Sequence, residues 1–159
     1  MIDFSQWKLT LPVDNVGGFD GVAREVKPLT ADFDYPPYYE KVSDGIIFSA
    51  PTDGATTSGS HYPRCELREM INGKEAAWRP KLPGKLACTL KVLEVPTRSD
   101  NKPGRIVIGQ IHGKSNELCR LYYDKGQLYF YDDKAGSSKK ETKFVLKDAD
   151  GNFTSIPIG

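Results

Sequence analysis

Two short stretches of the sequence carry side chains that could act on an acidic substrate. The first contains Arg64, Glu66 and Arg68, which the alternation of a strand places on one face. A carboxylate between two arginines can orient both guanidinium groups and leave donors free for a ligand carboxylate or phosphate. A solvated row of ion pairs explains the same pattern, so both interpretations stand. Tyr62 and the polar loop at residues 56–61 add groups beside the row that can hydrogen-bond a sugar.

The second stretch is an apolar segment, residues 105–112, that turns polar at its end. Alternation predicts that Ile106 and Ile108 share a face with Gln110 and His112. An amide can donate hydrogen bonds to a substrate, and an imidazole can move a proton near neutral pH. The alternative is that His112 is a structural side chain with satisfied hydrogen bonds.

Other common chemistries lack their residues. The sequence has no glycine-rich phosphate loop before a helix, no Gly-x-Ser-x-Gly segment and no His/Cys set at metal spacing. Cys65, Cys88 and Cys119 allow one disulfide at most, and their spacing does not rank the three pairings. They also fit the role of small apolar residues in buried strands. No metal or organic cofactor is implied.

Length and charge indicate one soluble domain over residues 1–159. The chain has 22 Lys+Arg against 21 Asp+Glu, a net charge of +1, which gives no global attraction to nucleic acid or to a membrane. No stretch approaches the length of a membrane span, and the first residues lack the pattern of a signal peptide.

The pattern of apolar residues predicts an all-β protein. Fifteen glycines and eleven prolines separate short apolar stretches, and no window keeps a helical period. The predicted strands cover residues 7–11, 45–50, 64–70, 85–95, 105–112, 118–123, 127–132 and 141–146. A tight hairpin turn is expected at residues 123–127, and residues 12–44 are expected to form a long ordered connection. Strands without intervening helices favour an antiparallel β-sandwich of jelly-roll type.

Aromatic residues alternate along the predicted hairpin. Core and cross-strand pairing explains them better than a stacking platform does, and the residues concerned are Tyr122, Tyr123, Tyr129, Phe130 and Tyr131.

Taken in order, these stretches resemble the alginate lyases of polysaccharide lyase family 7. Residues 7–12 read Trp-Lys-Leu-Thr-Leu-Pro, like the opening of that family. Residues 64–68 are similar to its Arg-Ser/Thr-Glu-Leu-Arg motif, with Cys65 at the Ser/Thr position, and residues 110–112 match its Gln-Ile/Val-His motif. Cys65 is expected on the face away from Arg64, where it changes packing more than chemistry.

The resemblance implies a secreted jelly-roll enzyme that cleaves alginate, an acidic polysaccharide, by β-elimination without a cofactor. It implies cleavage at bonds inside the alginate polymer. From Ile111, it also implies a preference for stretches of alginate that contain guluronate. The implied catalytic residues are Arg64, Gln110 and His112, and the implied substrate-binding residues are Tyr62, Glu66 and Arg68.

One family motif, Tyr-Phe-Lys-Ala-Gly-x-Tyr-x-Gln with its proton-transferring tyrosine, does not occur in the sequence. The resemblance therefore implies a truncated domain that lacks its C-terminal strands and that a complementary C-terminal segment would complete. A polyuronate-binding module without catalysis, or an inactive fragment, is the alternative function.

Overall fold

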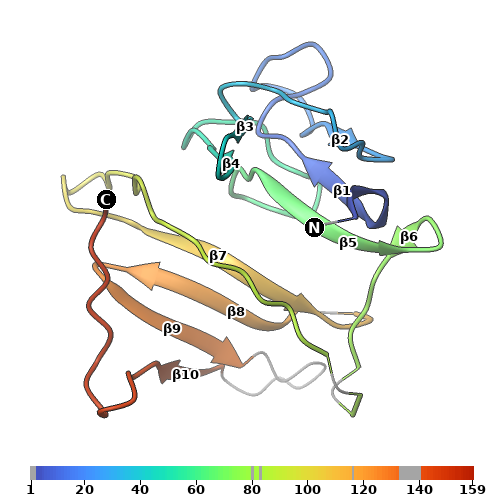
Figure 1. Cartoon of the computed structure of the whole chain (residues 1–159). Helices are drawn as coiled ribbons and strands as arrows, with labels where there is room; N and C mark the ends of the chain where they lie inside the picture. Colours follow the sequence, from blue (N-terminus) through green and yellow to red (C-terminus); the bar gives the residue numbers. More distant parts are fainter. Residues whose placement is uncertain (1–2, 80, 83, 116, 133–140) are drawn as a thin grey trace. The chain divides into compact units, whose positions relative to one another are not determined.

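The computed structural model describes residues 3–79, 81–82, 84–115, 117–132 and 141–159 (Figure 1). In these residues the one helical element is the 3-10 turn η1 (Phe4–Gln6), and the named strands all pair antiparallel. The prediction of an antiparallel all-β protein is confirmed. The chain forms two compact units, Met1–Ala76 and Ala77–Gly159. The single domain over residues 1–159 stays a prediction.

The sheet of the first unit is built around β1 (Trp7–Thr10). Its strand order is β2-β1-β5-β6, with β2 at Glu25–Val26, β5 at Glu66–Ile71 and β6 at Lys74–Glu75. Along β1 and β5, Leu9 lies opposite Leu67 and Lys8 lies opposite Arg68. A separate hairpin joins β3 (Tyr39–Val42) to β4 (Gly45–Phe48).

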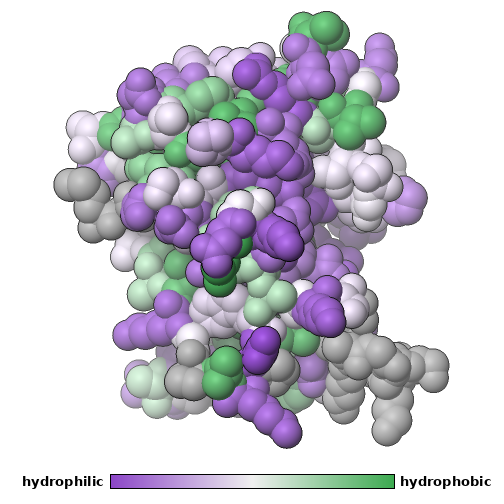
Figure 2. Space-filling view, turned by 90° about the vertical axis from the view of Figure 1, so that its right-hand side faces the viewer, coloured by the Kyte–Doolittle hydropathy of each residue, from purple (hydrophilic) through white to green (hydrophobic). Residues whose placement is uncertain are grey.

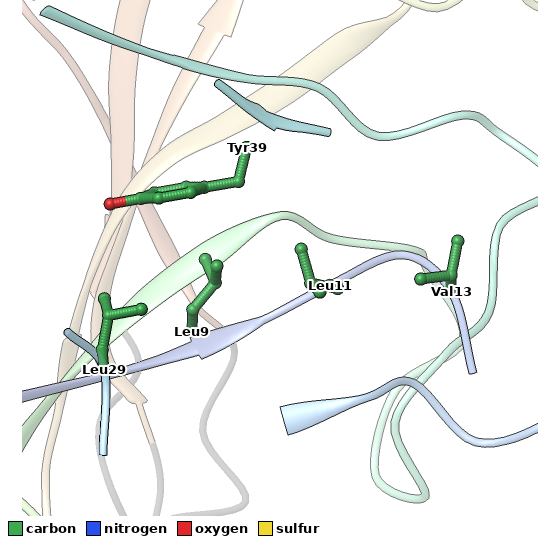
Figure 3. Packing of buried hydrophobic residues seen from close by; sticks show 5 residues of the cluster. All are labelled: Leu9, Leu11, Val13, Leu29 and Tyr39. Atoms are coloured by element: carbon green, nitrogen blue, oxygen red, sulfur yellow. The ribbon is translucent and has the colours of Figure 1, made fainter. Parts of the chain in front are cut away.

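One face of β1 contributes to the apolar core of this unit. The core side chains are at most 2% exposed, and they are Leu9, Leu11, Val13, Leu29 and Tyr39 (Figure 3). Cys65 and Leu67 pack against this cluster from the segment that leads into β5 and from β5 itself. Burial of each large apolar side chain contributes roughly 1.5–3 kcal/mol. The core therefore determines which face of β5 points inward.

The opposite face of the same sheet is charged. Lys8 is 6% exposed, and its ammonium pairs with Glu25 on β2 and Glu75 on β6. Burial opposes the charged form of Lys8, but its hydrogen bonds to both carboxylates outweigh burial and raise its pKa. The same hydrogen bonds lower the pKa of Glu25 and of Glu75. These ion pairs link β1 to β2 and to β6.

The second unit contains a sheet with strand order β10-β9-β8-β7 (Figure 1). Its strands are β7 (Arg105–His112), β8 (Glu117–Asp124), β9 (Gln127–Asp132) and β10 (Thr142–Val145). Lys125 and Gly126 join β8 to β9 with φ values of 52° and 84°. Positive φ at both central residues is typical of a two-residue hairpin turn, so the predicted hairpin is confirmed.

The tyrosines of this sheet pack against one another. Tyr122 stacks on Tyr129 with ring centroids 5.2 Å apart, and Tyr131 meets both rings edge-on at 5.7 Å. On the other face, Phe130 stacks on Phe144 at 4.9 Å. Tyr123 is 2% exposed, and its hydroxyl donates to the Ile156 carbonyl at 2.9 Å. The predicted core and cross-strand role of these aromatic residues is confirmed.

A β-bulge in β7 corrects the predicted alternation. Val107 pairs with Tyr122 and Gly109 pairs with Leu121, which leaves Ile108 as an extra residue. An extra residue shifts the phase of all that follow it. Gln110 therefore shares a face with Tyr122, while Ile106 lies on the other face.

Three other predictions about the strands and connections differ from the structure. The strand predicted to begin at Arg64 begins at Glu66, and the connection predicted for residues 12–44 contains β2 and β3. The strand predicted for residues 85–95 is wrong, because this segment forms no strand and Leu86 and Leu93 are 66% and 54% exposed. A sequence with strand character forms a strand only where a neighbour supplies ladder hydrogen bonds.

The surface is mixed in polarity. Figure 2 shows hydrophilic side chains interspersed with hydrophobic ones over the face that it draws. Within the described ranges, no helix has the length and apolar character needed to cross a membrane.

The core position of Leu9 gives a stability prediction. Leu9→Ala should lower the free energy of unfolding by about 2–5 kcal/mol, because it leaves a cavity among fully buried neighbours. Val16 is 93% exposed, so Val16→Ala should change the free energy of unfolding by less than about 0.5 kcal/mol. Urea denaturation followed by tryptophan fluorescence measures both, and equal effects would contradict the core assignment.

Candidate active site

In the first unit, Arg64 is held by two side chains close to it in the sequence. One guanidinium nitrogen donates to Glu66 Oε2 at 3.0 Å, and the other donates to Ser60 Oγ at 2.7 Å. Both members of the Arg64–Glu66 pair stay partly exposed, at 30% and 28% of their side chains. This ion pair confirms that the two residues share a face.

Arg68 has other partners than those expected. Its guanidinium donates to the Ala76 carbonyl at 2.9 Å and lies 3.8 Å from Glu75 Oε2. The prediction that Glu66 orients both arginines is therefore wrong for Arg68, since Glu75 on β6 and Ala76 directly after β6 are its partners. Because β6 follows β5 through a tight turn, this arrangement depends on how the two strands pair.

Sequence reasoning missed the role of Ser60. Its hydroxyl donates to the Tyr62 carbonyl, accepts from the Tyr62 amide and accepts from Arg64. The Tyr62 side chain is 78% exposed. The spacing of Ser60 and Arg64 could have indicated this contact, because a serine hydroxyl in a polar loop can hydrogen-bond to an arginine four residues later. Ser60 thus holds Arg64 and the backbone of Tyr62.

In the second unit, Gln110 and His112 contact each other. Nε2 of His112 lies 3.1 Å from Oε1 of Gln110, and both residues are partly buried. An amide oxygen can only accept, so this contact assigns the hydrogen to Nε2 of His112. In this arrangement the amide nitrogen of Gln110 is not engaged by His112, and its two hydrogens can be donated to another group. The predicted pairing on one face is confirmed.

The structure thus brings the predicted site residues together in two groups. Arg64 and Glu66 meet through an ion pair, with Arg68 further along the same strand face, and Gln110 meets His112. Each group lies within its own unit. None of the described residues forms a cluster of three or more His, Cys, Asp or Glu side chains that could hold a metal ion.

Cys65 lies on the core side of the arginine row, as expected. Its thiol donates to the Tyr38 carbonyl at 3.0 Å, and burial raises its pKa to about 12. All three cysteines are free, with Cys88 exposed and Cys119 partly buried. Cys65, which stands at the Ser/Thr position of the family motif, therefore affects the packing beside Arg64.

Comparison with known proteins identifies the family. The sequence profile of the alginate lyase family matches residues 2–158. This chain belongs to the alginate lyase family. An alginate lyase from Klebsiella pneumoniae is 31% identical to it over an alignment of 192 residues. This confirms the resemblance stated from the motifs.

Solved structures of alginate lyases share the fold. The chain matches the crystal structure of the Klebsiella pneumoniae alginate lyase with a TM-score of 0.76 at 30% identity, over 91% of its own length. It matches an alginate lyase from Pseudomonas aeruginosa with a TM-score of 0.64 and a member of polysaccharide lyase family 7 with a TM-score of 0.61, both at 23% identity. These likenesses confirm the predicted sandwich of jelly-roll type.

The chain spans about three fifths of the length of the Klebsiella pneumoniae alginate lyase. The alignment with the Klebsiella pneumoniae protein covers 98% of this chain and 62% of that protein. The match to its crystal structure covers 61% of that chain.

The cysteine environments give a prediction for thiol labelling. At pH 8 the thiol of Cys65 should stay protonated and unreactive, because its pKa is about 12, whereas the exposed Cys88 should react. A chromogenic disulfide reagent should label Cys88 in a fast phase and Cys65 only in urea. Cys88→Ser should remove the fast phase, and fast labelling of Cys65 in the native protein would contradict its burial.

Proposed function

We propose that this chain carries binding and catalytic residues of a lyase that cleaves alginate by β-elimination. The contact between Gln110 and His112 supports this proposal most directly, because it pairs a hydrogen-bond donor with a group that can transfer a proton. Membership of the alginate lyase family supports the substrate class.

In this proposal, Arg64 and Gln110 stabilise the charge that develops on the substrate. The proton at C5 of a uronate is weakly acidic, so elimination needs the adjacent carboxylate neutralised and the enolate stabilised. Donors held in place before the reaction act like an oxyanion hole, where each is worth about 3–4 kcal/mol. Ser60 and Glu66 hold Arg64 in this way.

Two roles remain open for His112. It takes the C5 proton as a neutral imidazole, or it helps neutralise the carboxylate while a tyrosinate takes the proton. The leaving oxygen at C4 also needs a proton donor. The family resemblance assigns that donor to a tyrosine in the motif that this sequence lacks. A polyuronate-binding module without turnover is therefore the second candidate function.

We also propose that a complementary segment completes the second unit. The face of the sheet that carries the Phe130–Phe144 stack leaves Phe144 44% and Ile111 39% exposed. The segment 85–95 has strand character without a ladder partner among the described residues. Uncovered apolar faces and unpaired strands favour association. Elimination activity would then need the segment, and the chain without it would tend to aggregate.

The finer substrate assignment is part of the same proposal. Ile111, in the Gln-Ile/Val-His motif, supports cleavage within guluronate-containing stretches, in line with the family resemblance. Secretion of the enzyme, which the family resemblance implies, is part of the same proposal.

The first prediction concerns the catalytic pair, measured with the complementary segment supplied if the parent needs it. Gln110→Ala should lower kcat about 10²–10³-fold through loss of a donor, and His112→Ala about 10²–10⁴-fold through loss of proton transfer. The ultraviolet absorbance of unsaturated uronate ends reports the rate on alginate, polyguluronate and polymannuronate. Near-parental turnover by His112→Ala would make His112 structural, and faster cleavage of polymannuronate would contradict the guluronate preference.

The second prediction concerns alginate binding by the arginine row. Arg64→Ala should weaken binding roughly 10–100-fold, as expected for loss of a charged hydrogen bond. Glu69→Ala should have a smaller effect, because Glu69 alternates to the other face of β5. Arg98→Ala removes an exposed arginine elsewhere and serves as the matched control for charge. Calorimetric titration at fixed salt measures all three, and equal losses for Arg64→Ala and Arg98→Ala would rule out a specific role for Arg64.

A further inference from the structure

The end of β7 that carries His112 receives a backbone hydrogen bond from outside its sheet. The amide of Trp78 donates to the His112 carbonyl at 2.8 Å. β7 is the last strand in the order β10-β9-β8-β7, and among the described residues no strand pairs with its other edge. Trp78 therefore supplies at His112 the hydrogen bond that a neighbouring strand would otherwise supply.

The pairing of β7 with β8 is irregular at the same point. Ile111 pairs with Cys119. The next residue, His112, pairs with Glu117, so the register shifts between the last two residues of β7. A shifted register disrupts the ladder locally and bends the strand. The bond from Trp78 therefore restrains His112 where the pairing with β8 is least regular.

Trp78 is itself held by a close approach of Gly84. A Cβ atom at position 84 would lie 2.5 Å from Cζ3 and 2.7 Å from Cε3 of the Trp78 ring, which is closer than side chains pack. Gly84 does not have a positive φ, so the close approach of its backbone to the indole is what requires glycine here. A turn in which the Leu82 amide donates to the Arg79 carbonyl at 2.9 Å lies between the two residues.

The backbone position of His112 determines whether its ring reaches Gln110. The two side chains leave the strand two residues apart on one face, and Nε2 of His112 lies 3.1 Å from Oε1 of Gln110. A hydrogen bond of this length tolerates little displacement of either residue. A shift of about 1 Å at a catalytic group can lower a rate about 100-fold.

We propose that Trp78, packed on Gly84, is a positioning residue that holds His112 against Gln110. Trp78 acts through the backbone of His112 and needs no contact with the substrate. This inference rests on the proposed function, which gives His112 its catalytic role, and it adds a residue that the family motifs do not contain.

The first measurement observes the His112 imidazole by NMR at pH 8 in the full chain. The chain has two histidines, so His61 serves as an internal reference. The parent should show His112 with its hydrogen on Nε2, because the amide oxygen of Gln110 accepts it. Gly84→Ala should displace the indole and give His112 a mixture of tautomers, and Trp78→Ala should do the same. The His61 signals should not change.

Amide exchange reports the hydrogen bond itself. The amide of residue 78 should exchange about tenfold faster in Gly84→Ala than in the parent, because its bond to His112 opens more often. Gly45→Ala is the matched control, since a Cβ atom at Gly45 meets nothing within 4 Å and should leave both His112 and the amide of residue 78 unchanged.

A double variant tests whether the contact with the indole is the cause. Phenylalanine is smaller than tryptophan and leaves room for the added methyl group, so Trp78→Phe combined with Gly84→Ala should restore the Nε2–H tautomer of His112. Thermal unfolding shows which variants fold, and if Trp78→Ala does not fold, Gly84→Ala and the double variant decide.

The second measurement is the rate of elimination on alginate, with the complementary segment supplied if the parent needs it. Gly84→Ala should lower kcat about 10–100-fold through displacement of His112. It should leave KM within about twofold, because the arginine row of the first unit is untouched. Gly45→Ala should turn over like the parent.

The outcomes separate this inference from the proposed function. An unchanged His112 tautomer in folded Gly84→Ala or folded Trp78→Ala overturns the inference, whether or not the parent is active. An equal change in Gly45→Ala, or a double variant that behaves like Gly84→Ala, overturns it as well. A parent without elimination whose His112 tautomer still changes in Gly84→Ala contradicts the lyase function and supports the positioning of His112.

Discussion

Two cations face each other where β1 pairs with β5, and the neighbouring strands must neutralise them. Lys8 lies directly opposite Arg68, an arrangement that is unfavourable without carboxylates nearby. Glu75 on β6 contacts both, and Glu25 on β2 takes the remaining side of Lys8. This charge balance requires all four strands of the sheet in their observed order. It also leaves Glu66 to pair with Arg64.

The apolar core on the opposite face of the sheet fixes the register in which β1 pairs with β5. Leu9 and Leu67 face each other toward the core, and a slip by one residue would turn Lys8 and Arg68 inward. The same logic applies in the second unit, where one face of the sheet carries the Tyr122–Tyr129 stack and the other carries Phe130. In both sheets, packing on one face determines which polar groups the opposite face presents.

Local patterns predicted much of the fold and of the site. The bounds of β7 and β9, the hairpin through Gly126 and the pairing of Gln110 with His112 follow from composition and alternation over a few residues. The prediction of a strand over residues 85–95 failed because a strand also needs a partner, which a local pattern does not supply. The bulge at Ile108 was missed for a related reason, since an extra residue is defined only against the strand that it fails to match.

The sequence by itself determined the family, the all-β class and the residues that share a strand face, because family motifs and the two-residue period of a strand are local properties. Only the tertiary structure decided the partners of those residues. The hydrogen bond from Arg64 to Ser60 depends on the path of a loop. The contact of Arg68 with Glu75, and the cross-strand alignment of Gln110 with Lys143, depend on how the strands pair. Such pairings are set by the register of the sheets, which depends on what each face buries.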